Sequence, residues 1–171
     1  MGFLLTFQQF SNNLRRMRKL IGLLLLLPGV LLTLGGAEPA GYKYWSAAEL
    51  KSMSKPLANK GDHDTSNENL GNWGADHALM IHREGSGLAE LHETEADVIV
   101  VVSGGGTLII GGTMPGSKST APGEVRGPSI DGGGKQKIGA GDILHIPPKT
   151  AHQLMLEPGT QITYFTLKVK E

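Results

Sequence analysis

The chain has no cysteine among its 171 residues. This absence excludes disulfide bonds, thiolate metal ligands, a cysteine nucleophile and a lipid-anchored cysteine. Acidic residues are also absent before Glu38, so this region takes its charge from Arg15, Arg16, Arg18 and Lys19. The rest of the chain holds the other 12 lysines and arginines against 16 acidic residues. A mildly acidic balance without a basic stripe argues against a nucleic-acid partner.

Two motifs of common enzyme classes are absent as well. The glycine runs at 104–106 and 132–134 are not followed by a helical pattern, so they do not indicate a phosphate-binding loop, and the chain has no serine nucleophile elbow. The 25 glycines, 9 prolines and 39% apolar residues instead favour an all-β protein with one core and tight turns. A length of 171 residues suits a single domain.

Residues 1–37 are predicted to be a secretory signal peptide. A basic cluster precedes the apolar run 20–34, and the small residues Gly35 and Ala37 fit the positions that a signal peptidase reads, so cleavage is expected after Ala37. An uncleaved membrane anchor is the alternative, but the run has about 15 residues and contains a proline, whereas a spanning helix needs roughly 20 residues. The mature chain is therefore expected in the periplasm or outside the cell, without a stable membrane anchor.

The first residues leave two starting points open. The stretch before Arg15 is longer than the usual basic region of a signal peptide, which makes Met17 an alternative to Met1. The pair Arg15-Arg16 is also compatible with a twin-arginine export signal.

Residues 38–76 are predicted to be an N-terminal arm made of a helix and a loop. The segment 46–49 has the form of a capping box, which predicts a short helix over 46–55 that is ended by Pro56. Residues 58–76 are polar and rich in turn-forming residues, so they are interpreted as loop.

Residues 77–171 are predicted to form one β-barrel domain. Short strand signals follow one another closely, and glycine-rich turns are expected at 85–87, 104–106 and 132–134. The absence of an internal repeat indicates one barrel, and Met114–Gly123 is interpreted as an exposed loop. The predicted strands span 77–83, 88–92, 97–102, 107–110, 124–130, 135–138, 142–146, 152–157 and 161–169.

Four side chains with metal-binding chemistry lie at the ends of these predicted strands. Glu90 and His92 are two residues apart, so on a strand both point to the same face. Asp97 begins the next strand after a short turn, and His152 opens a later strand after a proline-containing turn. On adjoining strands the four could converge on one divalent ion, and imidazole with carboxylate suits Fe, Mn, Zn or Ni.

Two segments of the chain resemble the conserved motifs of the cupin family. The first family motif is a His-x-His pair that is followed after four residues by glutamate and after six more by glycine. In this chain Glu90 stands at the first histidine, His92 at the second, Asp97 at the glutamate and Gly104 at the glycine.

The second family motif runs glycine, five residues, proline, one residue, glycine, two residues, histidine, three residues, asparagine. Gly141, Pro147 and His152 match at these spacings, whereas Lys149 replaces the glycine and Leu156 the asparagine. The resemblance covers about residues 78–169 and implies an all-β double-stranded β-helix, a jelly-roll barrel.

The resemblance implies a metal site in which His92 and His152 match family ligands directly. Glu90 offers a carboxylate where the family has imidazole, and Asp97 is one methylene shorter than glutamate. Either all four residues bind the ion, or His92 and His152 form a facial triad with one carboxylate. In a three-ligand site Glu90 could instead be the catalytic general base. A barrel that has lost its metal, with Glu90 and Asp97 at a solvated strand end, is the further alternative.

Three classes of function follow from this set of residues. The first is a metal-dependent enzyme acting on a small molecule, for which the resemblance implies dioxygenase, isomerase or lyase chemistry, decarboxylation included. The second is a non-catalytic module that binds a small molecule or carbohydrate. The third is a structural homodimer whose cavity is vestigial. The resemblance implies pairing through sheet edges and N-terminal segments, and the predicted helix with residues 42–45 could cover such an edge.

The other histidines and most aromatic residues are given structural roles. A hairpin between 77–83 and 88–92 would place His82 on the face away from the candidate ligands. His145 lies between apolar residues and is interpreted as a core histidine, with a pocket-lining acid or base as the alternative, and His63 as part of a solvated loop. The aromatic residues expected to be core or interface anchors are Trp73, Tyr42, Tyr44 and Trp45.

Overall fold

Ten antiparallel strands and one helix make up the part of the chain that the computed structural model describes, residues 38–58 and 65–171. Residues 41–171 form one compact unit. The predicted signal peptide at 1–37, with its two starting points, and His63 lie outside the described residues. Within those residues, no helix combines the length and the apolar character that a membrane crossing requires.

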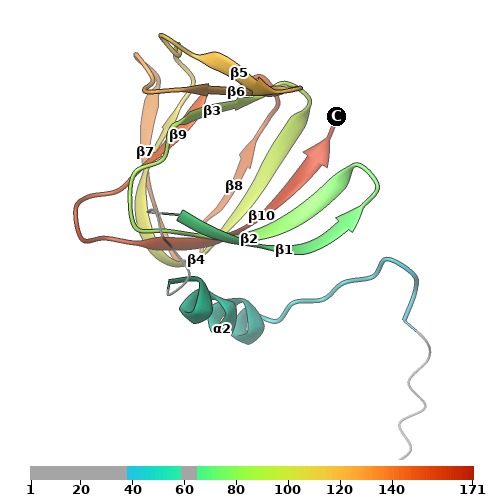
Figure 1. Cartoon of the computed structure of the whole chain (residues 1–171). Helices are drawn as coiled ribbons and strands as arrows, with labels where there is room; N and C mark the ends of the chain where they lie inside the picture. Colours follow the sequence, from blue (N-terminus) through green and yellow to red (C-terminus); the bar gives the residue numbers. More distant parts are fainter. Residues whose placement is uncertain (1–37, 59–64) are drawn as a thin grey trace, which may run out of the picture. The chain divides into compact units, whose positions relative to one another are not determined.

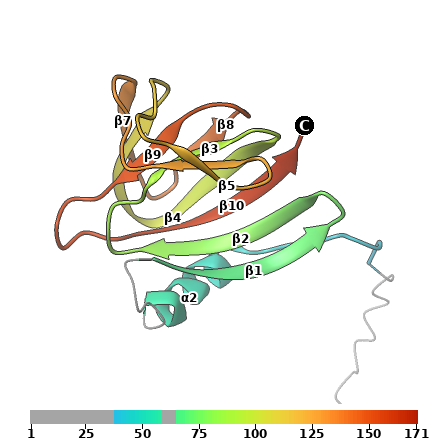
Figure 2. The ribbon, with the colours of Figure 1, turned by 45° about the horizontal axis from the view of Figure 1, so that its top comes forward.

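The strands form a curled sheet that wraps around an interior (Figures 1 and 2). Their hydrogen-bonded order is β1-β2-β10-β4-β9-β3-β6-β5, and β7 and β8 both pair with β4. Strands β3 and β9 are joined by one register pair, Glu90 with His152. The strands are β1 (Thr65–Trp73), β2 (Asp76–Arg83), β3 (Ala89–His92), β4 (Glu95–Ile110), β5 (Lys118–Ala121), β6 (Glu124–Gly127), β7 (Gly134–Gly139), β8 (Ile143–Ile146), β9 (His152–Met155) and β10 (Ile162–Lys170).

The prediction of an all-β barrel is confirmed, but two predicted strands are one. Strand β4 runs unbroken through Glu95–Ile110, so the turn predicted at 104–106 is wrong. The first half of β4 pairs with β8 and β10, and its second half pairs with β7 and β9. The glycines mark the place where the strand passes from one set of partners to the other, and a glycine inside a strand often marks such a bend or a close backbone approach.

Gly104 is required at this bend for two reasons. Its φ of +72° lies in the left-handed region, and a Cβ at this position would overlap the backbone carbonyl of Gln161. We expect Gly104→Ala to lower the free energy of unfolding by about 2–5 kcal/mol, because a left-handed conformation costs roughly 1–2 kcal/mol and overpacking about 1–3. Urea denaturation followed by circular dichroism measures this loss.

The matched control is Gly132→Ala in the turn before β7. Gly132 also has a positive φ, of +77°, but a Cβ there would meet nothing within 4 Å. The control variant should therefore lose only the conformational part, about 1–2 kcal/mol. Equal losses in the two variants would show that the crowding at Gly104 does not contribute to the free energy of unfolding.

The N-terminal arm differs from its prediction in two places. The capping box at 46–49 is confirmed, since the Ser46 amide donates to the Glu49 carboxylate at 2.9 Å and the Glu49 amide donates to the Ser46 hydroxyl at 3.2 Å. The helix, α2 (Ala47–Ala58), nevertheless continues past Pro56, because a proline in the last turn removes only one backbone donor. The predicted loop at 58–76 is wrong over Thr65–Trp73, which forms β1.

The sequence did not predict β1 because this strand lies at the edge of the sheet. It pairs only with β2, and most of its side chains are exposed or half-buried, so its sequence shows no apolar alternation. Likewise, the exposed segment 114–123 was expected to be loop throughout, but its residues Lys118–Ala121 form the fully exposed β5. Neither face of such an edge strand is buried, so its sequence does not show the alternation of apolar and polar residues from which strands are predicted.

Helix α2 packs against β1, β2 and β4 on the outside of the barrel (Figure 2). Its Leu57 is fully buried, which contributes roughly 1.5–3 kcal/mol of hydrophobic stabilisation. The Trp45 ring lies 6.0 Å from that of Trp73 and 5.4 Å from that of Phe165, which confirms the predicted anchor role of both tryptophans. Tyr42 and Tyr44 are 52% and 70% exposed, so neither is a core residue.

The structure separates two histidines from the candidate site. The predicted hairpin between β2 and β3 is wrong, because β2 pairs with β1 and β10 while β3 pairs with β6 and β9. His82 is still structural: it is buried and hydrogen-bonded to the Thr163 hydroxyl at 2.8 Å. His145 is exposed on β8, so both the core and the pocket interpretations were wrong.

Candidate functional site

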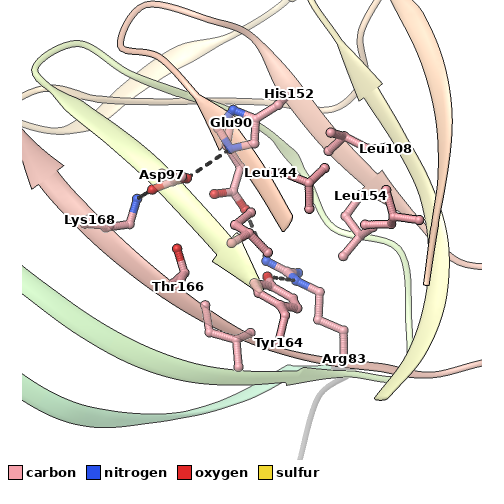
Figure 3. Close-up of a pocket in the computed structure, with 13 residues that line it drawn as sticks. Arg83, Glu90, Asp97, Leu108, Leu144, His152, Leu154, Tyr164, Thr166 and Lys168 are labelled. Carbon is pink, nitrogen blue, oxygen red and sulfur yellow. Dashed lines mark hydrogen bonds and ion pairs between the residues drawn. The ribbon is translucent and has the colours of Figure 1, made fainter. Parts of the chain in front are cut away.

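The barrel interior holds a small cavity with an apolar side and a polar side (Figure 3). Its volume is about 70 Å³, which is room for about five water molecules at the roughly 10–15 Å³ that each needs. The polar side chains come from several strands and face one another across this space. The apolar lining residues are Ile81, Ile99, Leu108, Ile138, Leu144 and Leu154, and the polar ones are Arg83, Glu90, Asp97, His152, Tyr164, Thr166 and Lys168.

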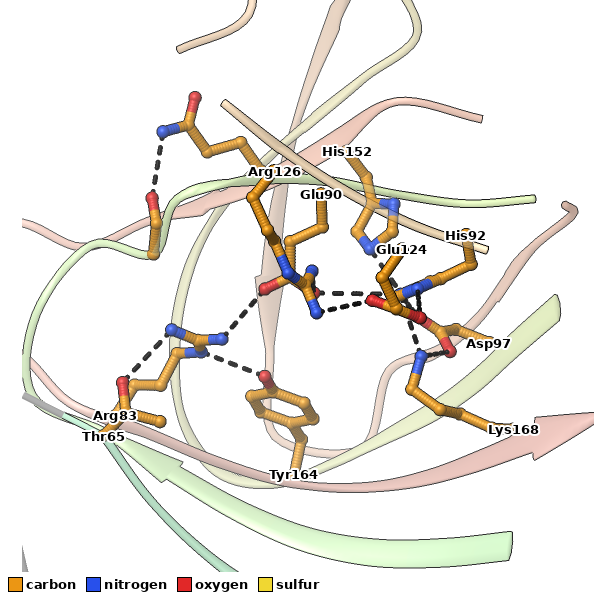
Figure 4. Close-up of polar contacts among 12 residues, drawn as sticks. Thr65, Arg83, Glu90, His92, Asp97, Glu124, Arg126, His152, Tyr164 and Lys168 are labelled. Carbon is orange, nitrogen blue, oxygen red and sulfur yellow. Dashed lines mark hydrogen bonds and ion pairs between the residues drawn. The ribbon is translucent and has the colours of Figure 1, made fainter. Parts of the chain in front are cut away.

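The four predicted ligands lie close together (Figure 4), and Glu90, Asp97 and His152 also line the cavity. Glu90 and His92 project from β3, and the register pair of β3 with β9 places His152 beside Glu90. Glu90, His92 and His152 each offer a ligand atom within 4.8 Å of the others. The Oδ2 atom of Asp97, on β4, lies 3.3 Å from Nε2 of His92 and 3.5 Å from Nε2 of His152.

Both imidazoles are oriented by a hydrogen bond from the nitrogen that faces away from the cluster. Nδ1 of His92 lies 2.6 Å from the Glu124 carboxylate, and Nδ1 of His152 donates to the Thr150 carbonyl at 3.0 Å. Metal-binding histidines almost always have such a partner, because it fixes the tautomer and the direction of the free nitrogen. Nε2 of both rings is thereby turned toward Asp97.

The ionisation of this cluster follows from its burial and its charges. Burial lowers the pKa of His152 and outweighs the carbonyl of Thr150 and the nearby carboxylates, which leaves the imidazole neutral at neutral pH. Burial alone would raise the pKa of Asp97, but contacts with His92 and Lys168 hold it at about 2. In the same way, Arg126, His152 and Arg83 reverse the effect of burial and lower the pKa of Glu90. Both carboxylates are therefore ionised.

Three cations that the sequence did not reveal neutralise three carboxylates here. Arg126 on β6 pairs with Glu90 and, at 2.8 Å, with Glu124. Arg83 on β2 donates to Glu90 at 3.1 Å and to the Tyr164 hydroxyl at 3.1 Å. Their positions depend on long-range pairings, of β3 with β6 and of β2 with β10, that no local spacing indicates.

Lys168 supplies the third cation, on the inner face of β10. Its ammonium lies 2.7 Å from Oδ1 of Asp97 and 2.8 Å from Nε2 of His92. The pKa of His92 is raised overall. Burial and the Lys168 ammonium lower it, but the contacts with Asp97 and Glu124 raise it by more. Although the pKa of His92 is raised, the ammonium 2.8 Å from Nε2 can only donate, so this contact places the imidazole proton on Nδ1, which faces Glu124.

Two hydroxyl groups of β10 complete the polar side of the cavity. Burial raises the pKa of Tyr164, against the effect of Arg83, so the phenol keeps its proton. Its oxygen accepts from Arg83, which leaves that proton for another acceptor. The Thr166 hydroxyl is buried and has no hydrogen-bond partner among the residues that the structure describes. An unpaired buried hydroxyl costs free energy, so it is a position where a bound molecule could be recognised.

A second, more open groove lies next to the cluster and has a volume of about 530 Å³. It is lined by 120–124 around the β5–β6 turn, by Glu95 on β4 and by His77 on β2. Lys168 lines both this groove and the inner cavity. His92, Glu95 and Glu124 form another group whose ligand atoms lie within 4.8 Å of one another. Glu124, predicted only as the start of a strand, thus belongs to the site.

The donor set fits a divalent transition metal. Two imidazole nitrogens and one ionised carboxylate form a two-histidine, one-carboxylate set, and both histidines already have an outer hydrogen-bond partner. Asp97 is close to both histidines but shares its carboxylate with Lys168. Glu90 likewise shares its carboxylate with Arg83 and Arg126, and it offers a ligand atom within 4.8 Å of those of His92 and His152.

No protein-family model and no curated protein sequence matches this chain significantly. Among solved structures, an uncharacterized conserved protein with a double-stranded β-helix domain from Klebsiella pneumoniae shares 13% identity, with a TM-score of 0.50 over 75% of this chain and 90% of that one. A cupin 2 conserved barrel domain protein from Rhodopseudomonas palustris matches at 17% identity and a TM-score of 0.44, over 63% of each chain. The polyketide cyclase RemF from Streptomyces resistomycificus matches at 17% identity and 0.44, over 61% of this chain and 64% of that one.

The last two matches cover less than two thirds of the solved chains. What the comparisons establish is the architecture: the barrel is a double-stranded β-helix, the fold of the cupins, as the two sequence motifs implied.

Proposed function

We propose that this cupin-fold barrel is an exported protein that binds a divalent metal through Glu90, His92 and His152 and acts on a small molecule in the adjoining cavity. The supporting observation is that these three residues offer ligand atoms within 4.8 Å of one another. In both histidines the other ring nitrogen, Nδ1, is held by a hydrogen bond. Three ligands leave coordination positions open for substrate, whereas a purely structural site is usually closed by a fourth protein ligand.

The chemistry proposed for this site is of the dioxygenase, isomerase or lyase type. Such a metal, when bound, would supply Lewis acidity or a binding position for oxygen. The protein would contribute an apolar wall and the Tyr164 hydroxyl as a hydrogen-bond donor. Glu90 is ionised and held by Arg83 and Arg126, which favours the role of ligand over that of general base.

The cavity restricts the substrate to a small molecule with an apolar part and a polar group. At about 70 Å³ it accommodates a molecule of about five heavy atoms, using the volume of one water as the unit. The apolar part would lie against Leu108, Leu144 and Leu154, and a hydroxyl or carbonyl would bond Tyr164 and Thr166.

Elemental analysis of the purified protein tests this proposal. The full chain is expressed without a metal-binding tag, stripped with a chelator, and then loaded separately with Fe(II), Mn(II), Zn(II) and Ni(II). We expect about one ion per chain with at least one of these metals, because the set offers three ligands for one ion. A protein that takes up no metal under any loading would contradict the metal site.

A non-catalytic binding module is the second candidate, and one observation favours it. Arg83, Arg126 and Lys168 already pair with the carboxylates of Glu90, Asp97 and Glu124, so each of these has a cationic partner without any ion. A chain that stays metal-free after loading would support this candidate, with the cavity then holding an organic ligand alone.

A further inference from the structure

Lys168 is a buried ammonium placed against two of the groups that surround the proposed metal site. Its side chain is 13% exposed, and that of Asp97, its partner, is 6% exposed. The ammonium lies 2.8 Å from Nε2 of His92, the atom turned toward the other candidate ligands (Figure 4). An ammonium has three donors and no acceptor, so its bond to Nε2 uses the lone pair of that nitrogen.

A metal ion at His92 would need the same lone pair. A histidine nitrogen binds zinc at about 2.0–2.1 Å, well inside the 2.8 Å at which Lys168 sits, so the two cations cannot share this atom. Their positive charges would also repel each other strongly in a site that is shielded from water.

Lys168 lies next to further carboxylates, of which Glu124 already pairs with Arg126. Lys168 lines the outer groove as well as the cavity, and the same groove contains the carboxylates of Glu95 and Glu124. A four-carbon stem with free rotation can exchange between such partners, and a lysine that leaves His92 would meet negative charge again on the other side.

We propose that Lys168 is an internal competitor of the metal: it occupies the His92 lone pair and the Asp97 carboxylate when no ion is bound, and it moves toward Glu95 and Glu124 when one binds. This inference rests on the proposed metal site and adds that the affinity of that site is set by a cation of the chain itself. The barrel thereby keeps its buried carboxylates compensated in both states.

Calorimetric titration of metal-free protein with Zn(II) or Mn(II) tests the competition through affinity alone. We expect Lys168→Met to bind about 5–150-fold more tightly than the unmodified protein, the usual range for coupling between two binding events. Lys168→Arg, which keeps the charge, should show no such gain. The matched control is Lys170→Met, since Lys170 is an exposed lysine at the end of the same strand.

A second variant covers the case in which Lys168→Met does not fold, because that change leaves Asp97 without its cation. Lys168→Gln retains a hydrogen-bond donor for Asp97 and should show the same direction of change. If the neutral variants bind metal and the unmodified protein binds none, Lys168 competes so strongly that it excludes the ion, which supports the proposal. If the unmodified protein binds metal and the neutral variants bind no tighter, the competition is refuted while the metal site stands. If no variant binds any metal, the metal site itself is refuted.

Discussion

Replacing His152 by alanine is expected to weaken metal binding by at least about 100-fold, the upper end of what losing even an outer hydrogen-bond partner costs. His92→Ala should have an effect of the same size, because each change removes one of the two imidazole ligands. Elemental analysis after loading and calorimetric titration both measure the loss. Persistent uptake at the original affinity in both variants would show that these histidines are not the ligands.

The chain contains a control of the same residue type. His82 is also buried and hydrogen-bonded, but its partners are Thr163 and Glu84. His82→Ala should therefore leave metal affinity unchanged even if it destabilises the fold. His152→Ala also separates the two possible sites, because an ion held by His92, Glu95 and Glu124 would survive it.

Removal of the Asp97 carboxylate is the second change with a large expected effect. Asp97→Ala should lower the free energy of unfolding of the metal-free protein by about 1–3 kcal/mol, because Lys168 loses the charged hydrogen bond to Asp97 and must turn to the carboxylates of the groove. The double variant Asp97→Ala with Lys168→Met should lose less than the single variant, since both charges of the pair are gone. Urea unfolding in the presence of a chelator gives these values.

The pH dependence of this loss has a defined sign. The pKa of Asp97 is lowered from 3.8 to about 2, so its contribution is complete above the unfolded value and is lost as the pH falls through about 2. The difference between the unmodified protein and Asp97→Ala should shrink over the same range. As a control, the exposed Asp131→Ala should change stability by less than about 0.5 kcal/mol at neutral pH. A loss at Asp97 no larger than that at Asp131 would show that the buried pair contributes nothing.

Part of the site was predictable because it depends on local spacing. Glu90 and His92 share a face by the two-residue period of a strand, and the spacing of His152 within its motif placed it at a strand start. The fold class was predictable in the same way, from short strands that alternate with turns. The pairings between strands were not, as the wrong hairpin at His82 shows.

The cations were missed because their positions are set by pairings between distant segments. On β10, Tyr164, Thr166 and Lys168 face the cavity. The residues that alternate with them, such as Phe165, include apolar ones. Apolar and polar residues thus occur on both faces, and the alternation does not say which face is inside. Strand β8 shows the same limit, since Ile143 is 73% exposed next to Leu144, which lines the cavity.

The single register pair between β3 and β9 has a mechanical consequence. Glu90 and His152, the two members of that pair, are also two of the three proposed ligands, so the ion would bridge the junction of the sheet that has the fewest backbone links. An ion there would add a link to this junction, beside the backbone hydrogen bonds from Lys149 to the His92 carbonyl at 2.7 Å and from Gly87 to the Leu154 carbonyl at 2.9 Å. Metal binding and the integrity of the barrel wall would then be linked, so that loading stabilises the folded barrel.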